Sequence, residues 1–407
     1  FDGTVGKAVG VNAVQQVLCH HSRLVRTSPE KTQINKALPL LALALAALCA
    51  VSATAQEIKI GIPGPVTGPV QFLGQHMKWG AELAVDDINR KGGVLGRKLS
   101  FIMQDSLCRP ADSVAATERL LSQDKVDIVL GDVCSGATLA LMPVIEKAGR
   151  PMIVSISTLP EITQKAGAGG NKWVFRSVPN DLMLANVIAR QMKPFKSIAF
   201  LGEDTDYGRG AIKLLKDKLG PDVKILSEDY VKQTENDFLP VFTRLRSTKP
   251  DALVIYMLDQ QGANMMKQYA QFGLSAPIVG RPPLVSPLVA ELLATGKFNG
   301  SWTVYPYYDK FSSPENDAFT KPFTEKNKQG PHYVAYGIYE AIQLAADAIK
   351  RAGSTEPNAV REALLKTSYK GILGTVKFDQ NNQSHNNLMY MLVENGKLGV
   401  KDLVAGQ

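Results

Sequence analysis

Residues 134–158, CSGATLALMPVIEKAGRPMIVSIST, decide the fold class of this 407-residue chain. VDIVLGD lies before this stretch, separated from it by Val133, and PMIVSIS lies near its end; small hydroxyl residues follow each of these apolar runs. Between them, the segment around ALMPVIEKA has the pattern of a helix. Two short apolar runs joined by one helix indicate neighbouring parallel strands with a helical crossover.

The same alternation continues on both sides of this stretch. EIKIGIP, LSFIMQD, VDIVLGD and PMIVSIS predict the strands of one lobe, and the pattern restarts after WVFRSVPND with SIAFLGED, VKILSEDYV, DALVIYMLD and APIVG. We therefore expect an α/β protein with two doubly wound, Rossmann-like lobes. The first would contain residues 56–177 and about 305–375, and the second residues 178–304 and about 376–407. A chain that crosses between lobes more than once makes a hinge, with a cleft between the strand ends.

The composition excludes some classes of function. The chain has 45% hydrophobic and 21% charged residues, enough to bury full cores. Its formal net charge is +8, but no basic block concentrates that charge. We therefore expect neither a nucleic-acid partner nor a basic membrane-binding surface, and the chain is expected to be a monomer.

The segment before Gln56 has the parts of a secretory signal. Lys36 precedes an apolar or small run over residues 37–51, and Ala53, Thr54 and Ala55 make a small-x-small site. We expect a signal peptide at residues 36–55, cleavage after Ala55 and export to the periplasm. Residues 1–35 are interpreted as an upstream extension of doubtful origin. The lipoprotein alternative, at Cys49, is disfavoured because Leu48 stands where a small residue is wanted.

Removal of this leader would leave Cys108 and Cys134 as the only cysteines of the mature chain. An even pair in an exported protein favours a disulfide, and two free buried thiols are the alternative. Closing a loop of this length should stabilise the fold by ~3 kcal/mol.

Hydroxyl residues follow two of the predicted strands where ligands of parallel sheets bind. Ser135 and Thr138 open a helix, and Ser157 and Thr158 leave the next strand. A helix N-terminus offers unpaired N–H groups and a partial positive charge, so it suits a carboxylate. The alternative, that these residues are ordinary helix caps, remains open.

Several blocks carry a family resemblance. EIKIGIPGPVTGPVQFLGQHMKWGAELAVDDINRKGGVLGRKL, VDIVLGDVCSGATLALMPVIEKAGRPMIVSISTLPEIT, VFRSVPND and GEDTDYGRG resemble the branched-chain amino acid binding proteins of ATP-driven (ABC) uptake systems. The resemblance runs from about Glu57 to the end of the chain. It implies the type I periplasmic binding fold, a receptor that hands its solute to membrane permease subunits, and no catalysis.

The resemblance also implies roles for single residues. Ser135 matches the family's carboxylate-binding serine, Ser157 and Thr158 match the pair that closes the same pocket, and Tyr207 matches an aromatic residue that covers the ligand. Cys108 and Cys134 match the family's disulfide in the first lobe.

The sequence departs from the family at the other end of the ligand. Amino-acid binders generally place an acid after the strand that here reads APIVG, but GRPPL follows, with Arg281. Asp259, Glu203 or Asp204 would then have to pair with an ammonium, and Leu73 stands where an aromatic residue is common. The expected ligand is therefore either an amino acid or a related non-amino carboxylate, aromatic acids included.

Other chemistry finds little support in the sequence. His76, His332 and His385 are widely separated, so no metal site is expected, and VCSGA lacks the first glycine of an esterase nucleophile elbow. We expect no cofactor and no enzyme activity. A ligand-sensing module of a signalling system and, more remotely, a secreted hydrolase are the alternatives. The aromatic residues of SWTVYPYYDKF are expected to pack in the core or to line the cleft.

Overall fold

The computed structural model describes residues 56–406, and Gln56–Gln407 form a compact unit of their own. The expected leader, its cleavage site and Cys49 lie outside the described residues. Within residues 56–406, no helix combines the length and the apolar character that a bilayer crossing requires.

The first parallel sheet has five strands in the order β2-β1-β3-β4-β5. Its strands are β1 (Ile58–Gly64), β2 (Leu99–Asp105), β3 (Ile128–Leu130), β4 (Met152–Val154) and β5 (Val174–Arg176). The crossovers are helices α2 (Gln71–Arg90), α3 (Pro110–Ser122), α4 (Ser135–Ala148) and α5 (Glu161–Gln164). The strand order reverses between β1 and β3, which is the point where open α/β sheets bind ligands.

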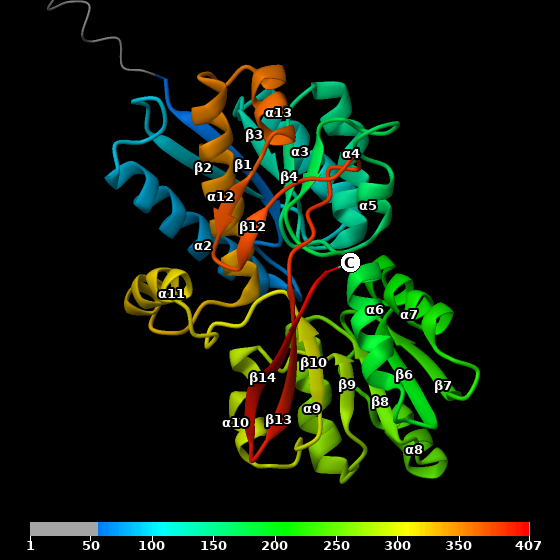
Figure 1. Ribbon diagram of the computed structural model, residues 1–407. Coiled ribbons are helices and arrows are strands. Elements are labelled where there is room, and N and C mark those ends of the chain that lie inside the picture. Colours follow the sequence, from blue (N-terminus) through cyan, green and yellow to red (C-terminus); the bar gives the residue numbers. More distant parts are fainter. Residues whose placement is uncertain (1–55, 407) are drawn as a thin grey trace, which may run out of the picture. The chain divides into compact units, whose positions relative to one another are not determined.

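The second parallel sheet repeats this construction with four strands in the order β7-β6-β8-β9 (Figure 1). Its strands are β6 (Ser197–Glu203), β7 (Lys224–Val231), β8 (Ala252–Tyr256) and β9 (Ile278–Arg281). The helices between and beside them are α6 (Asp181–Met192), α7 (Asp206–Lys218), α8 (Leu239–Thr248) and α9 (Asp259–Phe272). The fold class expected from the sequence, two doubly wound α/β lobes, is therefore confirmed.

Three further strands form a separate sheet, in the order β10-β13-β14, next to the second parallel sheet. After η2 (Pro287–Val289) and α10 (Ala290–Ala294), strand β10 (Trp302–Tyr305) pairs antiparallel with β13 (Leu388–Glu394), which pairs with β14 (Lys397–Val404). Ser301 and Thr303 tie this group to β9 by hydrogen bonds from Ile278 N to Ser301 Oγ (3.0 Å) and from Thr303 Oγ1 to Pro282 O (3.0 Å).

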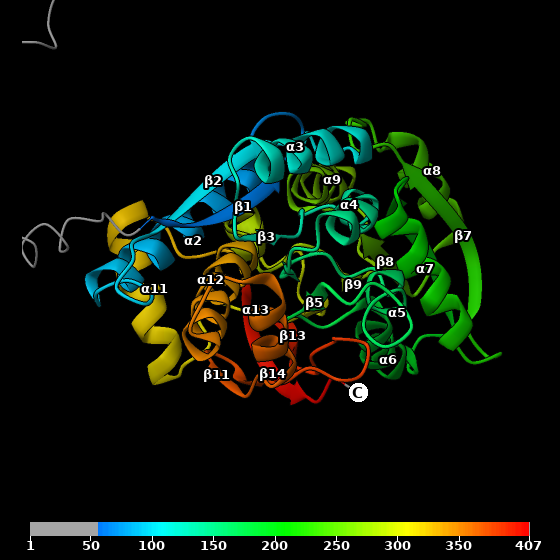
Figure 2. The same ribbon diagram turned by 90° about the horizontal axis from the view of Figure 1, so that it is seen from above.

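The segment between β10 and β13 returns to the first sheet. It contains α11 (Pro314–Asn327), α12 (Tyr333–Ala352), α13 (Pro357–Leu365) and the hairpin β11 (Tyr369–Gly371) and β12 (Gly374–Val376). Helix α12 lies beside α2 (Figure 2). Gly80 permits this close approach, because a Cβ there would lie 2.3 Å from the carbonyl oxygen of Ala335. The apolar face of α12 is fully buried, so it belongs to the core of the first lobe.

Three segments connect the two parallel sheets: residues 177–180, 306–313 and 377–387 (Figure 1). Two of them are joined by buried hydrogen bonds. Arg176 Nε donates to Gln383 Oε1 (2.7 Å), and Gln383 Nε2 donates to Val178 O (2.8 Å). The backbone N–H of Arg176 also donates to Asn382 O (2.9 Å). The first and third crossings therefore form one hydrogen-bonded unit.

Candidate functional site

A cavity of about 310 Å³ lies where the carboxyl ends of the two parallel sheets meet. Residues from both lobes line it. The first lobe contributes the disulfide, the start of α4 and the residues after β4, and the second contributes the ends of β6 and β9 and the start of α7. Seven of the binding residues considered from the sequence lie together in this wall: Ser135, Ser157, Thr158, Glu203, Asp204, Tyr207 and Arg281.

The N-terminus of α4 opens into the cavity. Its capping residue, Cys134, has extended backbone and makes no side-chain capping bond, and the first backbone bond of the helix runs from Thr138 N to Cys134 O (2.9 Å). Gly136 in this turn approaches the second lobe closely, since a Cβ there would lie 2.3 Å from Asp206 Oδ2. The helix start therefore offers backbone N–H groups, with the favourable end of its dipole, to an anion.

Ser135 is the hydroxyl residue best placed to bind a ligand. Its side chain is 3% exposed and lines the cavity, and its Oγ accepts a hydrogen bond from Leu159 N at 3.4 Å. Accepting this bond leaves the hydroxyl proton available for a ligand oxygen.

The hydroxyls of Ser157 and Thr158 differ from Ser135 because they already have partners. Ser157 Oγ lies 2.7 Å from both Asp132 O and Thr138 Oγ1, and Thr158 Oγ1 donates to Asp181 Oδ2 at 2.9 Å. These two side chains fix the shape of the wall. Toward a ligand, they offer backbone groups and remaining lone pairs rather than a free O–H.

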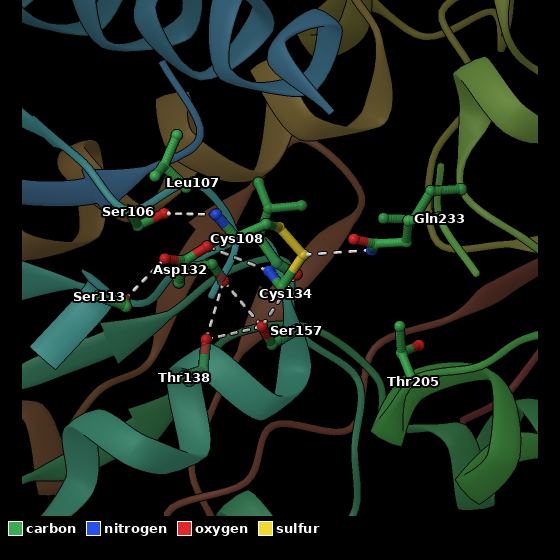
Figure 3. Close-up of a disulfide and its surroundings, with 12 residues drawn as sticks. Ser106, Leu107, Cys108, Ser113, Asp132, Cys134, Thr138, Ser157, Thr205 and Gln233 are labelled. Carbon is green, nitrogen blue, oxygen red and sulfur yellow. Dashed lines mark hydrogen bonds between the residues drawn. A yellow bond between two sulfur atoms is a disulfide. The ribbon is translucent and has the colours of Figure 1, made fainter. Parts of the chain in front are cut away.

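The expected disulfide between Cys108 and Cys134 is present and forms part of the wall (Figure 3). Asp132 holds the loop beneath it: its Oδ1 accepts from Cys134 N (3.1 Å) and its Oδ2 from Ser113 Oγ (2.8 Å). Burial raises the pKa of Asp132, and these hydrogen bonds oppose that rise. The arrangement fixes the capping residue of α4.

The second lobe contributes titratable side chains to the opposite wall. Glu203 ends β6, and burial raises its pKa to about 7. Tyr207 lies in the first turn of α7, after the capping residue Thr205, whose hydroxyl accepts from Gly208 N (3.3 Å). Burial holds the pKa of Tyr207 well above its usual value, so its hydroxyl stays neutral and can donate a hydrogen bond.

Arg281 ends β9 and is 2% exposed. The carbon of its guanidinium lies 4.6 Å from the ring centre of Tyr305, 5.8 Å from Tyr333 and 5.9 Å from Tyr207. Its Nη1 lies 3.7 Å from Asp181 Oδ1. Burial acts to lower the pKa of Arg281, but these tyrosines and Asp181 outweigh it, so the guanidinium stays charged.

Leu73 and Asp259 do not line this cavity. Leu73 is 1% exposed on α2 and packs in the core of the first lobe. Asp259 begins α9, and its Oδ1 lies 2.8 Å from Nε2 of the buried His332, the capping residue of α12. Because Asp259 already has this partner, it is not free to pair with a ligand ammonium.

The aromatic stretch after β9 packs mostly in the core. Trp302 contacts Tyr390, and Tyr307 stacks on Tyr336 with ring centres 4.3 Å apart. Tyr333, which sequence reasoning did not single out, does line the cavity, as does Gln233. A tyrosine at the first position of a long helix gives no signal of its own in the sequence.

Comparisons with known proteins agree with this fold. A family model described as "Periplasmic binding protein" matches residues 57–397. The leucine-, isoleucine-, valine-, threonine- and alanine-binding protein of Pseudomonas aeruginosa is 30% identical over 344 residues, which are 83% of this chain and 90% of that protein.

Two solved structures share the fold. The branched-chain amino acid transporter substrate-binding protein LivJ from Streptococcus pneumoniae, in complex with isoleucine, has a TM-score of 0.78 and 24% identity, covering 86% of this chain and all of that one (100%). An ABC transporter solute-binding protein from R. palustris, in complex with benzoate, also has a TM-score of 0.78, with 22% identity and coverage of 86% and 97%. With the matched family model, these findings show that the chain belongs to the periplasmic binding protein family, in its branched-chain amino acid type, and is a solute receptor rather than an enzyme.

Proposed function

We propose that the protein is an extracytoplasmic receptor of an ABC-type uptake system. It binds an amino acid or a related small carboxylate in the cavity between its lobes and delivers this ligand to the membrane permease. Membership of the periplasmic binding protein family supports the transport role, and the relatives' ligands support a small carboxylate.

One observation carries the proposal: the open N-terminus of α4, with the free hydroxyl proton of Ser135, faces a cavity that Tyr207 closes from the other lobe. Unpaired backbone N–H groups at a helix start bind a carboxylate without a positively charged side chain. A ligand that touches both lobes stabilises only the closed form, so its binding shifts the population toward closure.

We assign the moving parts as the sequence suggests. Residues 56–177 with about 305–375 form the first lobe, and residues 178–304 with about 376–407 form the second. The three crossing segments are the hinge. Ser157 and Thr158 shape the carboxylate end of the site through their backbone groups, and Leu73 and Asp259 act outside it.

The proposed location is the periplasm. Export would use residues 36–55 as a signal peptide, with cleavage after Ala55, and the mature receptor would meet the permease as a monomer. Expression of the full chain in a bacterium, followed by N-terminal sequencing of the periplasmic product, tests this. Gln56 is the expected first residue, and a different start would refute the cleavage site.

The carboxylate site is tested with ligand pairs that differ only at the carboxylate. Isothermal titration of the chain from Gln56 compares benzoate with benzamide, and leucine with leucinamide. We expect heat of binding from at least one acid and none from its amide, because the amide carries no charge for the start of α4. Equal binding of an acid and its amide would contradict the proposal.

A further inference from the structure

Asp259 and His332 form a buried hydrogen bond between the two lobes. Asp259 begins α9, between strands β8 and β9 of the second sheet, and His332 caps α12, which packs in the core of the first lobe (Figure 1). Asp259 Oδ1 lies 2.8 Å from His332 Nε2, and the two residues are 1% and 2% exposed. The bond takes no part in the carboxylate site, so the proposed function leaves it without a role.

The geometry of His332 assigns the proton of this bond. Its Nδ1 accepts from the backbone N–H of Val334 at 3.5 Å, so Nε2 carries the hydrogen and donates it to Asp259. Burial acts to raise the pKa of Asp259, but the interaction with His332 outweighs it, so this pKa lies below its usual value. An imidazole N–H therefore donates to an ionised carboxylate, which makes a strong hydrogen bond.

The surroundings of His332 are aromatic. Its ring centre lies 5.7 Å from that of Phe72, 5.2 Å from that of His76 and 4.4 Å from that of Tyr333. Burial and the nearby His332 lower the pKa of His76 to about 3, so His76 is neutral and does not compete for Asp259 as a cation. A hydrogen bond to a charge is electrostatically stronger in such a low-dielectric environment than in water.

The bond lies between two openings at the interface of the lobes. Leu258 and Tyr333, which are the chain neighbours of the pair, line the ligand cavity. Gln260, on the other side of Asp259, and Phe72 line a second groove, and apart from Gln260 this groove is lined by the first lobe. Because both openings lie between the lobes, parting the lobes would separate α9 from α12 and break the bond.

We propose that Asp259 and His332 form an interlobe latch: their hydrogen bond forms when the lobes close, breaks when they open, and favours closure independently of the ligand's own contacts. The inference rests on the proposed closure of the lobes and goes beyond it, because it assigns part of the closing free energy to the protein itself. A contact that exists only in the closed state tightens the binding of every ligand that needs that state.

Two variants of His332 separate the latch from the helix cap. Asparagine places a side-chain atom near the position of Nδ1, so His332→Asn keeps an acceptor for Val334 N and has no donor near Asp259. Glutamine reaches the position of Nε2, so His332→Gln keeps a donor to Asp259 and loses the cap. A latch and a helix cap therefore predict opposite orders of loss for the two variants.

Two measurements report the strength of closure. Dyes on Glu118→Cys in α3 and Asp217→Cys in α7, exposed positions of the first and second lobes, give the fraction of open molecules without ligand by energy transfer. Cys108 and Cys134 are joined to each other and take no dye. Isothermal titration of the same chain from Gln56 with leucine and with benzoate gives Kd.

A weaker latch raises the open fraction, Kd or both. As long as ligand-bound molecules stay mostly closed, the product of the two ratios, variant over wild type, equals the loss of closure. We expect this product to be at least about tenfold for His332→Asn, which loses one hydrogen bond to a charged group, and less than about threefold for His332→Gln. Tyr339→Phe is the control: it removes a hydrogen bond to Asp87 Oδ2 (2.8 Å) inside the first lobe and should change neither quantity.

The outcomes separate this inference from the proposed function. If an acid binds and the product for His332→Asn is near one, the receptor stands and the latch fails. A larger loss in His332→Gln than in His332→Asn would overturn the latch, because His332 would then act through the cap of α12. If neither acid binds the wild type, the proposed function fails and the open fraction alone decides: a rise in His332→Asn supports the latch, and an unchanged fraction overturns it.

Discussion

Replacing Ser135 with alanine should weaken ligand binding while leaving the empty protein almost unchanged. The hydroxyl makes one long bond inside the protein, from Leu159 N at 3.4 Å, so its removal should lower the free energy of unfolding by less than about 1 kcal/mol. A hydrogen bond to a charged group contributes about 1.5–3 kcal/mol. Loss of about 2 kcal/mol raises Kd about 30-fold.

A thermal-shift assay reads this loss directly. At a ligand concentration of about 100 times the wild-type Kd, binding stabilises the protein by about 2.7 kcal/mol, and a ~30-fold weaker variant retains about 0.9 kcal/mol. With about 2.1 cal/mol/K of unfolding entropy per residue over roughly 350 residues, the shift in Tm falls from about 4 °C to about 1 °C.

The control is Ser247→Ala, on the exposed surface of α8 far along the chain from the cavity. It should keep the full shift in Tm. If Ser135→Ala also keeps the full shift, the carboxylate does not lie at the start of α4, and the reasoning about that helix is wrong.

Three further predictions concern stability. Replacing Cys108 and Cys134 together with serine removes the disulfide between two residues 26 apart in sequence. This should lower the free energy of unfolding, measured in urea, by about 3 kcal/mol. An unchanged midpoint of the urea unfolding transition would contradict this prediction. Thr158→Val removes the donor to the buried Asp181, so unlike Ser135→Ala it should destabilise the empty protein, by about 1–3 kcal/mol in the same assay. Burial raises the pKa of Glu203 to about 7, so between about pH 4.5 and 7 the folded state holds a proton that the unfolded state loses. This group's contribution to stability therefore falls as pH rises from about 4.5 to 7. Glu203→Gln should remove up to about 3 kcal/mol of that pH dependence, and identical pH profiles of variant and wild type would refute the shift.

Residues that follow strands could be placed from the sequence because parallel sheets present their carboxyl ends at one edge. Ser135 follows β3 and Arg281 ends β9, so their meeting in one cavity follows from strand exits alone. The disulfide followed in the same way, since Cys108 and Cys134 both leave strands of the first sheet. The fold class needed only the alternation of apolar strands and helices.

Other features depend on packing between distant segments, which no local pattern reveals. Tyr333 reaches the cavity because α12 returns to the first sheet after the whole second sheet has been made. Asp259 has the appearance of a free acid at a strand exit, and only the arrangement of the lobes brings His332 to it. Strand β5 is only three residues long, and VFR in WVFRSVPND is not among the strands predicted from the sequence.

The role of Asp181 was hidden for a related reason. An acid in the first turn of a helix is common, because it favours the helix dipole. Its two partners are distant in sequence: Thr158 lies 23 positions before it, in the segment after β4, and Arg281 ends β9. Asp181 is therefore an ordinary residue within α6, and only its long-range contacts connect it to the wall of the cavity.

The hydrogen bonds between Arg176 and the 377–387 crossing limit how the molecule can open. In the proposed opening motion, two crossings joined by hydrogen bonds would act as one hinge axis, so rotation about that axis is expected to be easier than sliding or twisting. Closure about such an axis would bring the start of α7 to the start of α4, where the two lie in this structure. A hinge of this kind would lower the conformational entropy that the two lobes lose when a ligand holds them together.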